Sequence, residues 1–326
     1  MKAAWYDKTG DAQSVLQIGE RADPAPAPGE VLVRVRASGV NPSDVKTRGG
    51  ARGPIPFDFA IPHSDGAGVI EAVGAGVDAA RIGERVWLWN GAWKRQMGTC
   101  AQLIALPAEQ AVHLPDNTGF DAGACLGIPA STACYGVFSG GSVDGQTVLV
   151  TGGAGAVGYY AIQLAKWGGA RVISTVSGPE KAAIAKAAGA DAVINYREEG
   201  ALEQLLEATR GKSVDRVVEV EFGGNLALSN AVLKPEGVIA TYGSMADPTP
   251  QLPFYEMMFN GTKLDMYLVY LLQGEKRNMV CSTVNKALED GALQHMIAQV
   301  FPLEQTANAH IAVESGATIG NIVIEI

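Results

Sequence analysis

Three glycines that follow an apolar run are the residues of this sequence with the most specific chemistry. Residues 148–150 predict a buried strand, and Gly153, Gly155 and Gly158 follow it in the pattern G-x-G-x-x-G. In this pattern the first glycine permits a tight turn, the second lets the backbone approach a pyrophosphate, and the third allows close packing of strand and helix. Residues 161–165 have helical periodicity, so the turn leads into a helix N-terminus, whose unpaired N–H groups attract phosphate. The spacing therefore favours a dinucleotide site over a purely structural glycine-rich turn.

The end of the next strand indicates which dinucleotide is bound. NAD sites place Asp or Glu about 20 residues beyond the glycines, where the carboxylate binds the ribose 2′-hydroxyl. After the strand predicted over residues 171–176, this chain has Ser177 and Gly178, which leave room for a 2′-phosphate, and Lys181, which can bring a positive charge to it. We therefore expect NADPH; the alternative for Lys181 is a solvated surface lysine. A methyltransferase, which also uses a glycine-rich turn, is disfavoured because Ser177 stands where that class usually has an acid.

The length and composition agree with a two-domain soluble enzyme. A chain of 326 residues exceeds the usual size of a single hydrophobic core. Its 47% apolar and 18% charged residues are typical of a globular protein. The net charge of −9 comes without a basic cluster, which argues against nucleic acid or an anionic membrane as a partner.

The cysteines and the N-terminal residues favour a cytoplasmic protein. Four cysteines without paired spacing are typical of free thiols in a reducing compartment: Cys100, Cys125, Cys134 and Cys281. Residues 1–7 lack the apolar core of a signal peptide, and the longest apolar segment, 266–272, is too short to span a bilayer. We therefore expect a soluble protein without membrane association.

The elements that must position these residues change in type near residue 120. Before it, residues 30–37 alternate apolar and polar side chains, and residues 66–74 and 85–89 are further short segments bounded by turn residues. Such segments predict an antiparallel, barrel-like domain. After it, helices and strands alternate, which predicts βαβ units and a doubly wound parallel sheet. The predicted helices are 121–139, 157–167, 180–188, 201–209 and 226–233, and the predicted strands are 147–150, 171–176, 192–195, 214–220 and 237–242.

The C-terminal part of the chain has three further predicted elements. Residues 263–272 read as the final strand of the parallel sheet, residues 282–298 as a helix, and residues 320–326 as a strand. An apolar strand at a sheet edge has unpaired N–H and C=O groups, so we expect it to pair with a second copy; cover by an adjoining helix is the alternative. The last strand does not extend a nucleotide-binding unit. We expect it to return to the N-terminal β-domain, which makes that domain discontinuous.

Several motifs in a fixed order give nearly the whole chain a family resemblance. They are Gly39–Asp44, His63–Gly74, Gly127–Ala133, Gly152–Gly158, Val193–Glu199, Leu233–Ile239 and Ser315–Gly320. With them the chain resembles the medium-chain dehydrogenase/reductase superfamily and, within it, the zeta-crystallin-like NADPH:quinone oxidoreductases. The resemblance implies an α/β fold with a GroES-like β-barrel catalytic domain from residues 1–122 and 273–326. It also implies a Rossmann NADPH-binding domain from residues 123–272, and a homodimer or a tetramer.

Zinc is the first question that this resemblance raises. Zinc-dependent members have Cys and His ligands at positions that correspond to Asn41, Ser64 and Ile128 here, and none of these suits catalytic Zn²⁺. His63 lies one residue away from the motif without a neighbouring Cys or His, which favours a hydrogen-bonded structural role. In the region of the family's four-cysteine structural zinc lobe this chain has Cys100 alone. We therefore expect no metal.

Carried over residue by residue, the resemblance implies a set of cofactor contacts. The residues implied to surround the pyrophosphate are Gly153, Gly155, Ala156, Val157 and Gly158; those around the 2′-phosphate are Ser177, Lys181 and Tyr196; those along the adenine–nicotinamide ribose side are Gly223, Thr241, Tyr242, Gly243 and Ser244.

The resemblance implies two candidate catalytic residues. Asn41 is implied to lie near the nicotinamide and the substrate. Lys46 stands where relatives often have Tyr, and its charge would either stabilise a developing oxyanion or face solvent.

The function that these observations favour is NADPH-dependent, zinc-independent hydride transfer to a quinone or another α,β-unsaturated carbonyl compound. Such substrates accept hydride without a Lewis acid more readily than a simple ketone does, while the protein supplies orientation and electrostatics. The alternatives are an enoyl-thioester reductase and a non-catalytic NADPH-binding protein, as crystallins are.

Overall fold

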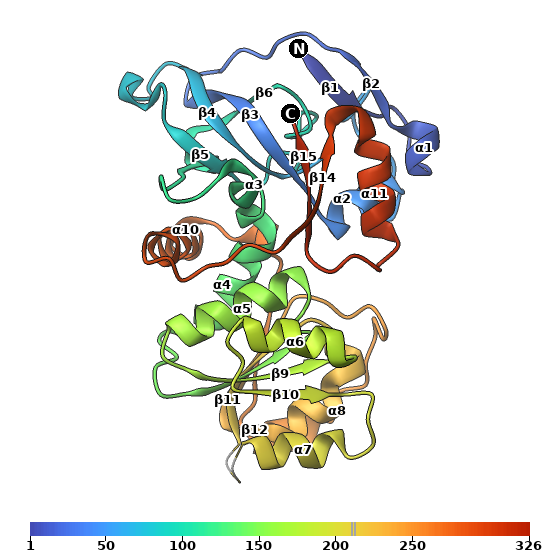
Figure 1. Ribbon diagram of the computed structural model, residues 1–326, viewed down its shortest axis with the longest axis vertical. Coiled ribbons are helices and arrows are strands. Elements are labelled where there is room, and N and C mark those ends of the chain that lie inside the picture. The colour runs from blue at the N-terminus through green and yellow to red at the C-terminus, as the bar shows by residue number, and fades with distance from the viewer. Residues whose placement is uncertain (210, 212) are drawn as a thin grey trace. The chain divides into compact units, whose positions relative to one another are not determined.

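The computed structural model describes residues 1–209, 211 and 213–326 and divides them into two compact units (Figure 1). One comprises residues 1–128 and 295–326, and the other residues 129–294. After the roles that the family resemblance implies, we call them the catalytic unit and the cofactor unit. The sequence placed these divisions at 122/123 and 272/273. The second one falls later because α10 (Gly274–Glu289) packs against α4 (Ser131–Phe138) in the cofactor unit.

The cofactor unit has a six-stranded parallel sheet with the order β10-β9-β8-β11-β12-β13. The order reverses between β8 and β11, as in a doubly wound nucleotide-binding fold, so the predicted fold class is confirmed. The inner strands contain fully buried apolar residues, because both faces of a parallel sheet are covered. They are β8 (Thr147–Thr151), β9 (Arg171–Val176), β10 (Ala192–Asn195), β11 (Val214–Glu219), β12 (Leu233–Thr241) and β13 (Lys263–Met266).

The helices of this unit follow the strands in alternation, and its core contains Leu149, Ile173, Val217 and Ile239, one from each of four strands. Besides α4 and α10 they are α5 (Ala156–Trp167), α6 (Pro179–Ala187), α7 (Ala201–Ala208), α8 (Phe222–Val232) and α9 (Phe254–Phe259).

The catalytic unit has a mainly antiparallel seven-stranded sheet with the order β14-β15-β3-β4-β5-β7, and β6 also pairs with β3. Its strands are β3 (Glu30–Val40), β4 (Asp65–Val73), β5 (Arg85–Leu88), β6 (Leu103–Pro107), β7 (Ala111–His113), β14 (Ile297–Pro302) and β15 (Asn321–Glu325), and β1 (Lys2–Trp5) pairs with β2 (Gln17–Glu20) beside it. The helices are α1 (Ala12–Val15), α2 (Pro42–Arg48), α3 (Phe120–Gly123) and α11 (Thr306–Glu314). Val323 of β15 lies opposite Gly39 of β3, so the predicted return of the C-terminal strand is confirmed.

Three predicted elements differ from the structure. Residues 121–139 are not one helix, because Pro129 interrupts the chain in a π-helical segment, Leu126–Ala130. The helix predicted over 282–298 ends at Glu289, and Gly291, with φ 67°, turns the chain towards β14. The predicted strand 263–272 ends at Met266 and gives way to a 3₁₀ turn, Val269–Leu271.

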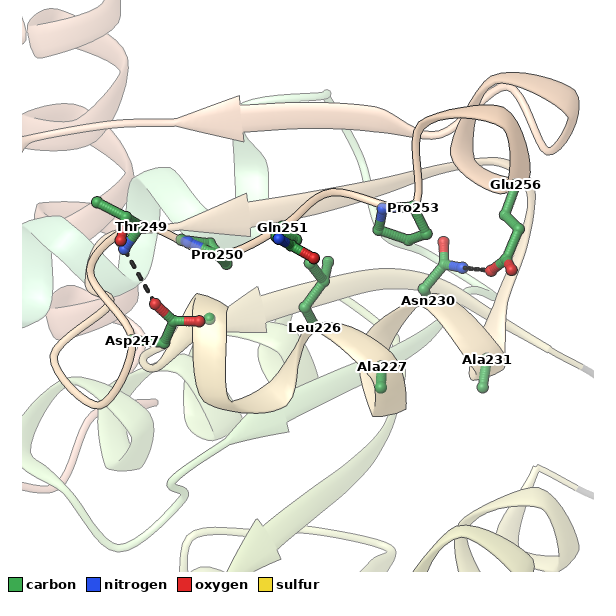
Figure 2. A pocket seen from close by; sticks show the side chains of 11 residues that line it. Leu226, Ala227, Asn230, Ala231, Asp247, Thr249, Pro250, Gln251, Pro253 and Glu256 are labelled. Carbon is green, nitrogen blue, oxygen red and sulfur yellow. Dashed lines mark hydrogen bonds between the residues drawn. The ribbon is translucent and has the colours of Figure 1, made fainter.

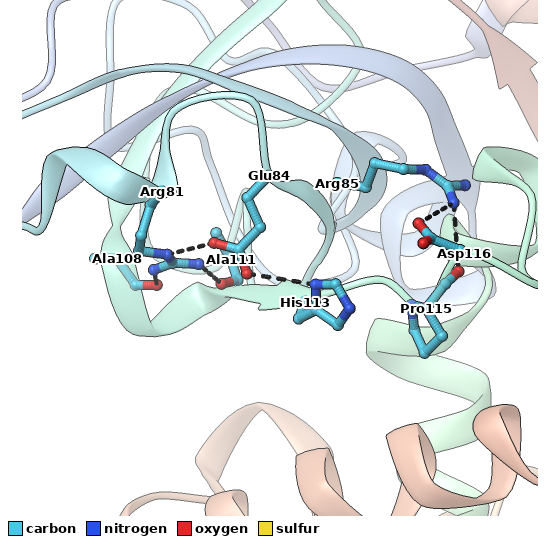
Figure 3. Close-up of polar contacts among 8 residues, drawn as sticks. All are labelled: Arg81, Glu84, Arg85, Ala108, Ala111, His113, Pro115 and Asp116. Atoms are coloured by element: carbon cyan, nitrogen blue, oxygen red, sulfur yellow. Dashed lines mark hydrogen bonds and ion pairs between the residues drawn. The ribbon is translucent and has the colours of Figure 1, made fainter.

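Arginines connect the loops that precede and follow β7 (Figure 3). Arg81 donates to the carbonyl oxygens of Ala108 and Ala111 at 2.9 and 2.6 Å and to Glu84 at 2.6 Å. Arg85 donates to the carbonyl oxygen of Thr118 at 2.6 Å. These bonds satisfy backbone carbonyl groups on both sides of β7, and so they hold the chain that leads towards α3.

Candidate cofactor and active site

The glycine-rich turn has the strand, turn and helix in the predicted order. Gly152, with φ 68°, follows β8, and Gly155 is the N-cap of α5. A Cβ on Gly153 would overlap the Ser174 hydroxyl, and a Cβ on Gly158 would overlap the Gly152 carbonyl. The turn therefore needs glycine at these positions, and its backbone N–H groups lie at the start of α5, where an anion is favoured.

The end of β9 places the residues implied for the 2′-phosphate near one another in the sheet. Ser177 follows β9 directly, and Lys181 lies in the first turn of α6, partly exposed. Asn195 of β10 pairs with Val176, so Tyr196 and Ser177 leave adjacent strands at the same level. Tyr196 is 46% exposed, which leaves its ring accessible to a ligand.

The ends of β11 and β12 bring together the last group of implied cofactor residues. The Gly223 N–H donates to the Ser244 hydroxyl at 2.9 Å, and the Tyr242 N–H donates to the Glu219 carbonyl at 3.2 Å. Thr241 is the last residue of β12, and Gly243 accepts from the Phe222 N–H at 2.8 Å. These loops lie at the carboxyl end of the parallel sheet, where ligands bind in such folds.

A buried carboxylate that sequence reasoning missed organises these loops. Glu219 is fully buried at the end of β11 and accepts hydrogen bonds at 2.7–2.8 Å from the hydroxyls of Thr151 and Ser229, the amide of Asn225 and the N–H of Glu221. A buried carboxylate is tolerated when it is hydrogen-bonded in this way. The available signal was an acid at the end of an apolar strand.

Three tyrosines form a cluster in the cofactor unit, and sequence reasoning found one of them. The Tyr267 ring packs against the Tyr135 ring in a tilted arrangement with centroids 4.8 Å apart, and its centroid lies 6.0 Å from that of Tyr242. Its hydroxyl donates to the Thr132 carbonyl at 2.8 Å. Burial raises the pKa of both Tyr242 and Tyr267, so both stay neutral hydrogen-bond donors.

In the catalytic unit, Asn41 is the N-cap of α2 and is almost fully buried. Its N–H donates to the Asp44 carboxylate at 2.8 Å, and its side-chain Nδ2 donates to Asp65 Oδ2 at 2.9 Å. Burial raises the pKa of Asp44 to about 7. Lys46, the other candidate catalytic residue, lies on the exposed side of α2.

One cavity of about 640 Å³ lies in the cofactor unit between α8 and the segment 247–256 (Figure 2). Of the candidate site residues, Gly223 is among those that line it. Asn230 Nδ2 donates to Glu256 at 3.3 Å at one end, and the Thr249 N–H donates to Asp247 at 3.1 Å at the other. The side chains between them are mostly small or apolar: Leu226, Ala227, Ala231, Pro250 and Pro253.

Comparison with known proteins identifies the family. Residues 27–116 match the family described as alcohol dehydrogenase GroES-like domain, and residues 156–284 the one described as zinc-binding dehydrogenase. A quinone oxidoreductase of Sus scrofa is 31% identical over 95% of this chain and 93% of its own length. The chain belongs to the quinone oxidoreductase family of the medium-chain dehydrogenases/reductases.

The names of two further relatives state a substrate of one and a bound cofactor of the other. A 2-haloacrylate reductase of a Burkholderia species is 30% identical to this oxidoreductase over 92% of each chain. The crystal structure of Escherichia coli quinone oxidoreductase complexed with NADPH has 28% identity and a TM-score of 0.86, with both chains fully covered.

One of the two matched families is described as zinc-binding, but the residues of this quinone oxidoreductase homologue at the expected ligand positions are not suited to bind zinc. The Asn41 amide and the Ile128 N–H both donate to Asp65, and Ser64 offers at most a hydroxyl. His63 is fully buried, and its two ring nitrogens lie 2.9 Å from Ser38 Oγ and 2.8 Å from His310 Nε2, so its predicted hydrogen-bonded role is confirmed. Within the described parts of the chain, no three His, Cys, Asp or Glu side chains gather as a metal site would require.

None of the helices that the structure describes combines the length and apolar character that crossing a bilayer requires.

Proposed function

We propose that this chain is an NADPH-dependent, zinc-independent oxidoreductase that transfers hydride to a quinone or another α,β-unsaturated carbonyl compound. The observation that carries the proposal is the turn after β8, where glycines that admit no Cβ open the N-terminus of α5. The neutral Ser177 beyond β9 and the nearby Lys181 support NADPH over NADH.

The cofactor would supply a hydride from its nicotinamide ring. The N–H groups at the start of α5, from Gly155 to Gly158, would bind its pyrophosphate, and Ser177, Lys181 and Tyr196 would surround its 2′-phosphate. Glu219 would hold the loop after β11 in place, because its carboxylate accepts hydrogen bonds from the Glu221 N–H in that loop and from the Thr151 hydroxyl at the end of β8.

The substrate class follows from the groups available to the carbonyl oxygen. A conjugated carbonyl spreads the charge that hydride addition creates, so a hydrogen-bond donor stabilises it without a metal. Asn41 carries such a donor, and Lys46 would add a positive charge if it faces the substrate. The proton that completes the reduction would come from water or a neighbouring donor. The name of the Burkholderia relative, a 2-haloacrylate reductase, supports unsaturated carbonyl substrates.

We further propose a homodimer in the cytoplasm. Among the residues that the structure describes, β13 pairs with β12 alone and so has one free edge. Apolar side chains near it are exposed: Phe259, Met266, Leu268 and Leu271. Antiparallel pairing of two such edges would bury them across a two-fold axis. The four cysteines are free thiols, which supports a reducing compartment.

The test is steady-state oxidation of NADPH and of NADH by the purified protein with three acceptors: a benzoquinone, a simple enone and an enoyl-thioester. We expect turnover with NADPH and the quinone or the enone. Turnover of the thioester alone would replace the proposal by an enoyl-thioester reductase. Tight NADPH binding without oxidation by any acceptor would support a binding protein instead.

A further inference from the structure

The Asp65 carboxylate lies at the meeting point of two segments that are far apart in the sequence. Asp65 is the first residue of β4 and is fully buried. Its Oδ2 accepts from Asn41 Nδ2 at 2.9 Å and from the Ile128 N–H at 3.0 Å. It therefore connects the N-terminus of α2 with the π-helical segment at which the chain passes from one unit to the other.

Two glycines pack close to Asp65. A Cβ on Gly127 would overlap Asp65 Oδ1 and the Leu88 carbonyl oxygen, and a Cβ on Gly39 would overlap the Ala124 carbonyl oxygen and come within 3.2 Å of the Asp65 Cβ. Both Gly127 and Gly39 have ordinary negative φ, so steric room and not backbone conformation requires glycine here. Gly127 therefore leaves room for the Asp65 carboxylate.

A buried chain of hydrogen bonds holds the Asp65 main chain. The Thr99 hydroxyl donates to the Asp65 carbonyl at 2.5 Å, and its single hydrogen is then used, so it accepts from Ser38 at 2.7 Å. Ser38 in turn accepts from His63 Nδ1 at 2.9 Å, and His63 Nε2 accepts from His310 Nε2 at 2.8 Å. All the donors point one way, towards Asp65.

The carboxylate fixes which way the Asn41 amide faces. A carboxylate oxygen accepts and does not donate when ionised, so Nδ2 and not Oδ1 must face Asp65. The Asn41 oxygen faces the other way and takes part in the capping box with the Asp44 N–H. A flip of the Asn41 amide would lose the bond to Asp65 and the capping interaction with Asp44. These two interactions therefore fix the direction in which the second hydrogen on Nδ2 points.

We propose that Asp65 is a positioning residue that holds Asn41 as a hydrogen-bond donor for the carbonyl group that is reduced. This inference rests on the proposed function. Zinc-dependent members of the superfamily carry metal ligands at the positions of Asn41 and Ile128. In this chain both residues instead donate hydrogen bonds to the buried Asp65 carboxylate. The activating group is then a positioned N–H and not a Lewis acid.

The first experiment is a double-mutant cycle of Asp65→Ala and Asn41→Ala, with kcat measured for NADPH and the best acceptor. In the wild-type background Asp65→Ala is expected to lower kcat about 10- to 100-fold with little change in the Kd of NADPH, because the donor loses its orientation. In the Asn41→Ala background the same change is expected to have no further effect on kcat. Equal losses in both backgrounds would overturn the proposal.

Asp65→Asn is the matched control, because its amide oxygen can still accept both N–H groups in the same space. We expect it to keep kcat within about threefold of the parent, since the acceptor and not the charge orients Asn41. If Asp65→Ala does not fold, Asp65→Ser takes its place in the cycle. A loss in Asp65→Asn as large as in the truncation would also contradict the proposal.

A second readout does not depend on turnover. The side-chain amide signals of Asn41 in a ¹⁵N NMR spectrum, assigned by their loss in Asn41→Ala, are expected to be sharp and shifted in the parent protein and averaged in the Asp65 truncation. If the protein reduces no carbonyl compound, the proposed function fails, and these signals still decide whether Asp65 orients Asn41. Unchanged signals in the truncation would overturn the positioning role by itself.

Discussion

His63 shows how a single residue can be held in a conformation that it disfavours. Its φ of 75° lies in the left-handed region, which costs a non-glycine residue of order 1 kcal/mol or more. The hydrogen bonds of both ring nitrogens, to Ser38 and to His310, offset that cost, because the side chain has no access to water. A glycine at this position would relieve the backbone and leave His310 without its partner.

The buried histidines predict acid lability. Burial lowers the pKa of His63 far below its usual value and that of His310 to about 3, with Arg48 contributing at His310. Unfolded histidines titrate near 6.5, so below that pH the unfolded state takes up protons that the folded state refuses, and stability falls as the pH drops from about 6.5 towards 3. Asp44 acts in the opposite direction, because its raised pKa lets the folded state take up a proton below about 7.

The variant His310→Gln tests this expectation. Between pH 6.5 and pH 4, the unfolding free energy of the variant should fall by about 3 kcal/mol less than that of the parent. The reason is that glutamine does not titrate, whereas His310 has a strongly lowered pKa in the folded state. Urea unfolding at several pH values measures this slope. Parallel curves for the two proteins would show that His310 does not titrate as inferred.

Lys181 carries the prediction of cofactor preference. The variant Lys181→Ala is expected to weaken NADPH binding about ten- to hundredfold and to leave NADH binding unchanged, because it removes one charge-assisted contact to the 2′-phosphate. Fluorescence titration measures both affinities. Lys186→Ala, further along α6, is the control and should change neither. Equal affinity of the parent for the two cofactors would refute the assignment.

At the scale of the element, the turn from β8 into α5 depends on glycine, because a side chain would not fit between the strand and the helix. Gly158 packs against the Gly152 carbonyl, so the helix approaches the strand more closely than any Cβ allows. This contact lies within seven residues of sequence, which is why its pattern could be recognised without a structure.

The variant Gly158→Ala is therefore expected to weaken NADPH binding more than tenfold and to lower stability by about 1–3 kcal/mol, because the added methyl forces helix and strand apart. Calorimetric titration and thermal unfolding measure the two effects. Gly119→Ala is the matched control, because nothing lies near a Cβ at Gly119 and its φ is −70°. A Gly158→Ala protein that binds NADPH normally would mean that the turn does not hold the pyrophosphate.

At the scale of the whole molecule, the free edge of β13 carries the prediction of self-association. The Tyr267 N–H donates inwards to Thr241, so the N–H of Met266, the residue before it, points away from β12. Met266 is 71% exposed. Met266→Pro removes an outward donor and keeps the inward bonds.

In sedimentation experiments at micromolar concentration, we expect the parent protein to be a dimer and Met266→Pro to shift towards monomer. Unchanged thermal unfolding of the diluted proteins would show that the variant still folds. A monomeric parent would refute the proposal directly.

Zinc independence is also a property of the whole chain. Elemental analysis of the purified protein should find much less than one zinc per chain, and EDTA should leave activity unchanged. The reason is that the Asn41 amide and the Ile128 N–H donate hydrogen bonds to Asp65 and are not metal ligands. Stoichiometric zinc would show that the ligand positions were assigned wrongly.

The sequence by itself determined the parallel sheet with its glycine-rich turn, the return of the last strand to the first domain, and the family. These features depend on periodicity and on motifs of a few neighbouring residues, which act locally. Sequence reasoning overextended the helix predicted over 282–298 and the strand predicted over 263–272, because apolar periodicity continues past Gly291 and Met266, where the backbone turns.

Only the tertiary structure decided what surrounds the candidate site. The Asp65 carboxylate accepts hydrogen bonds from residues at positions 41 and 128, and the Glu219 carboxylate from residues at positions 151, 221, 225 and 229. The sequence around each acid does not indicate which distant residues these partners are. The sequence indicated which residues could bind a dinucleotide, since a backbone turn is encoded by its own residues. The orientation of a buried side chain is decided by partners that folding brings together from distant strands.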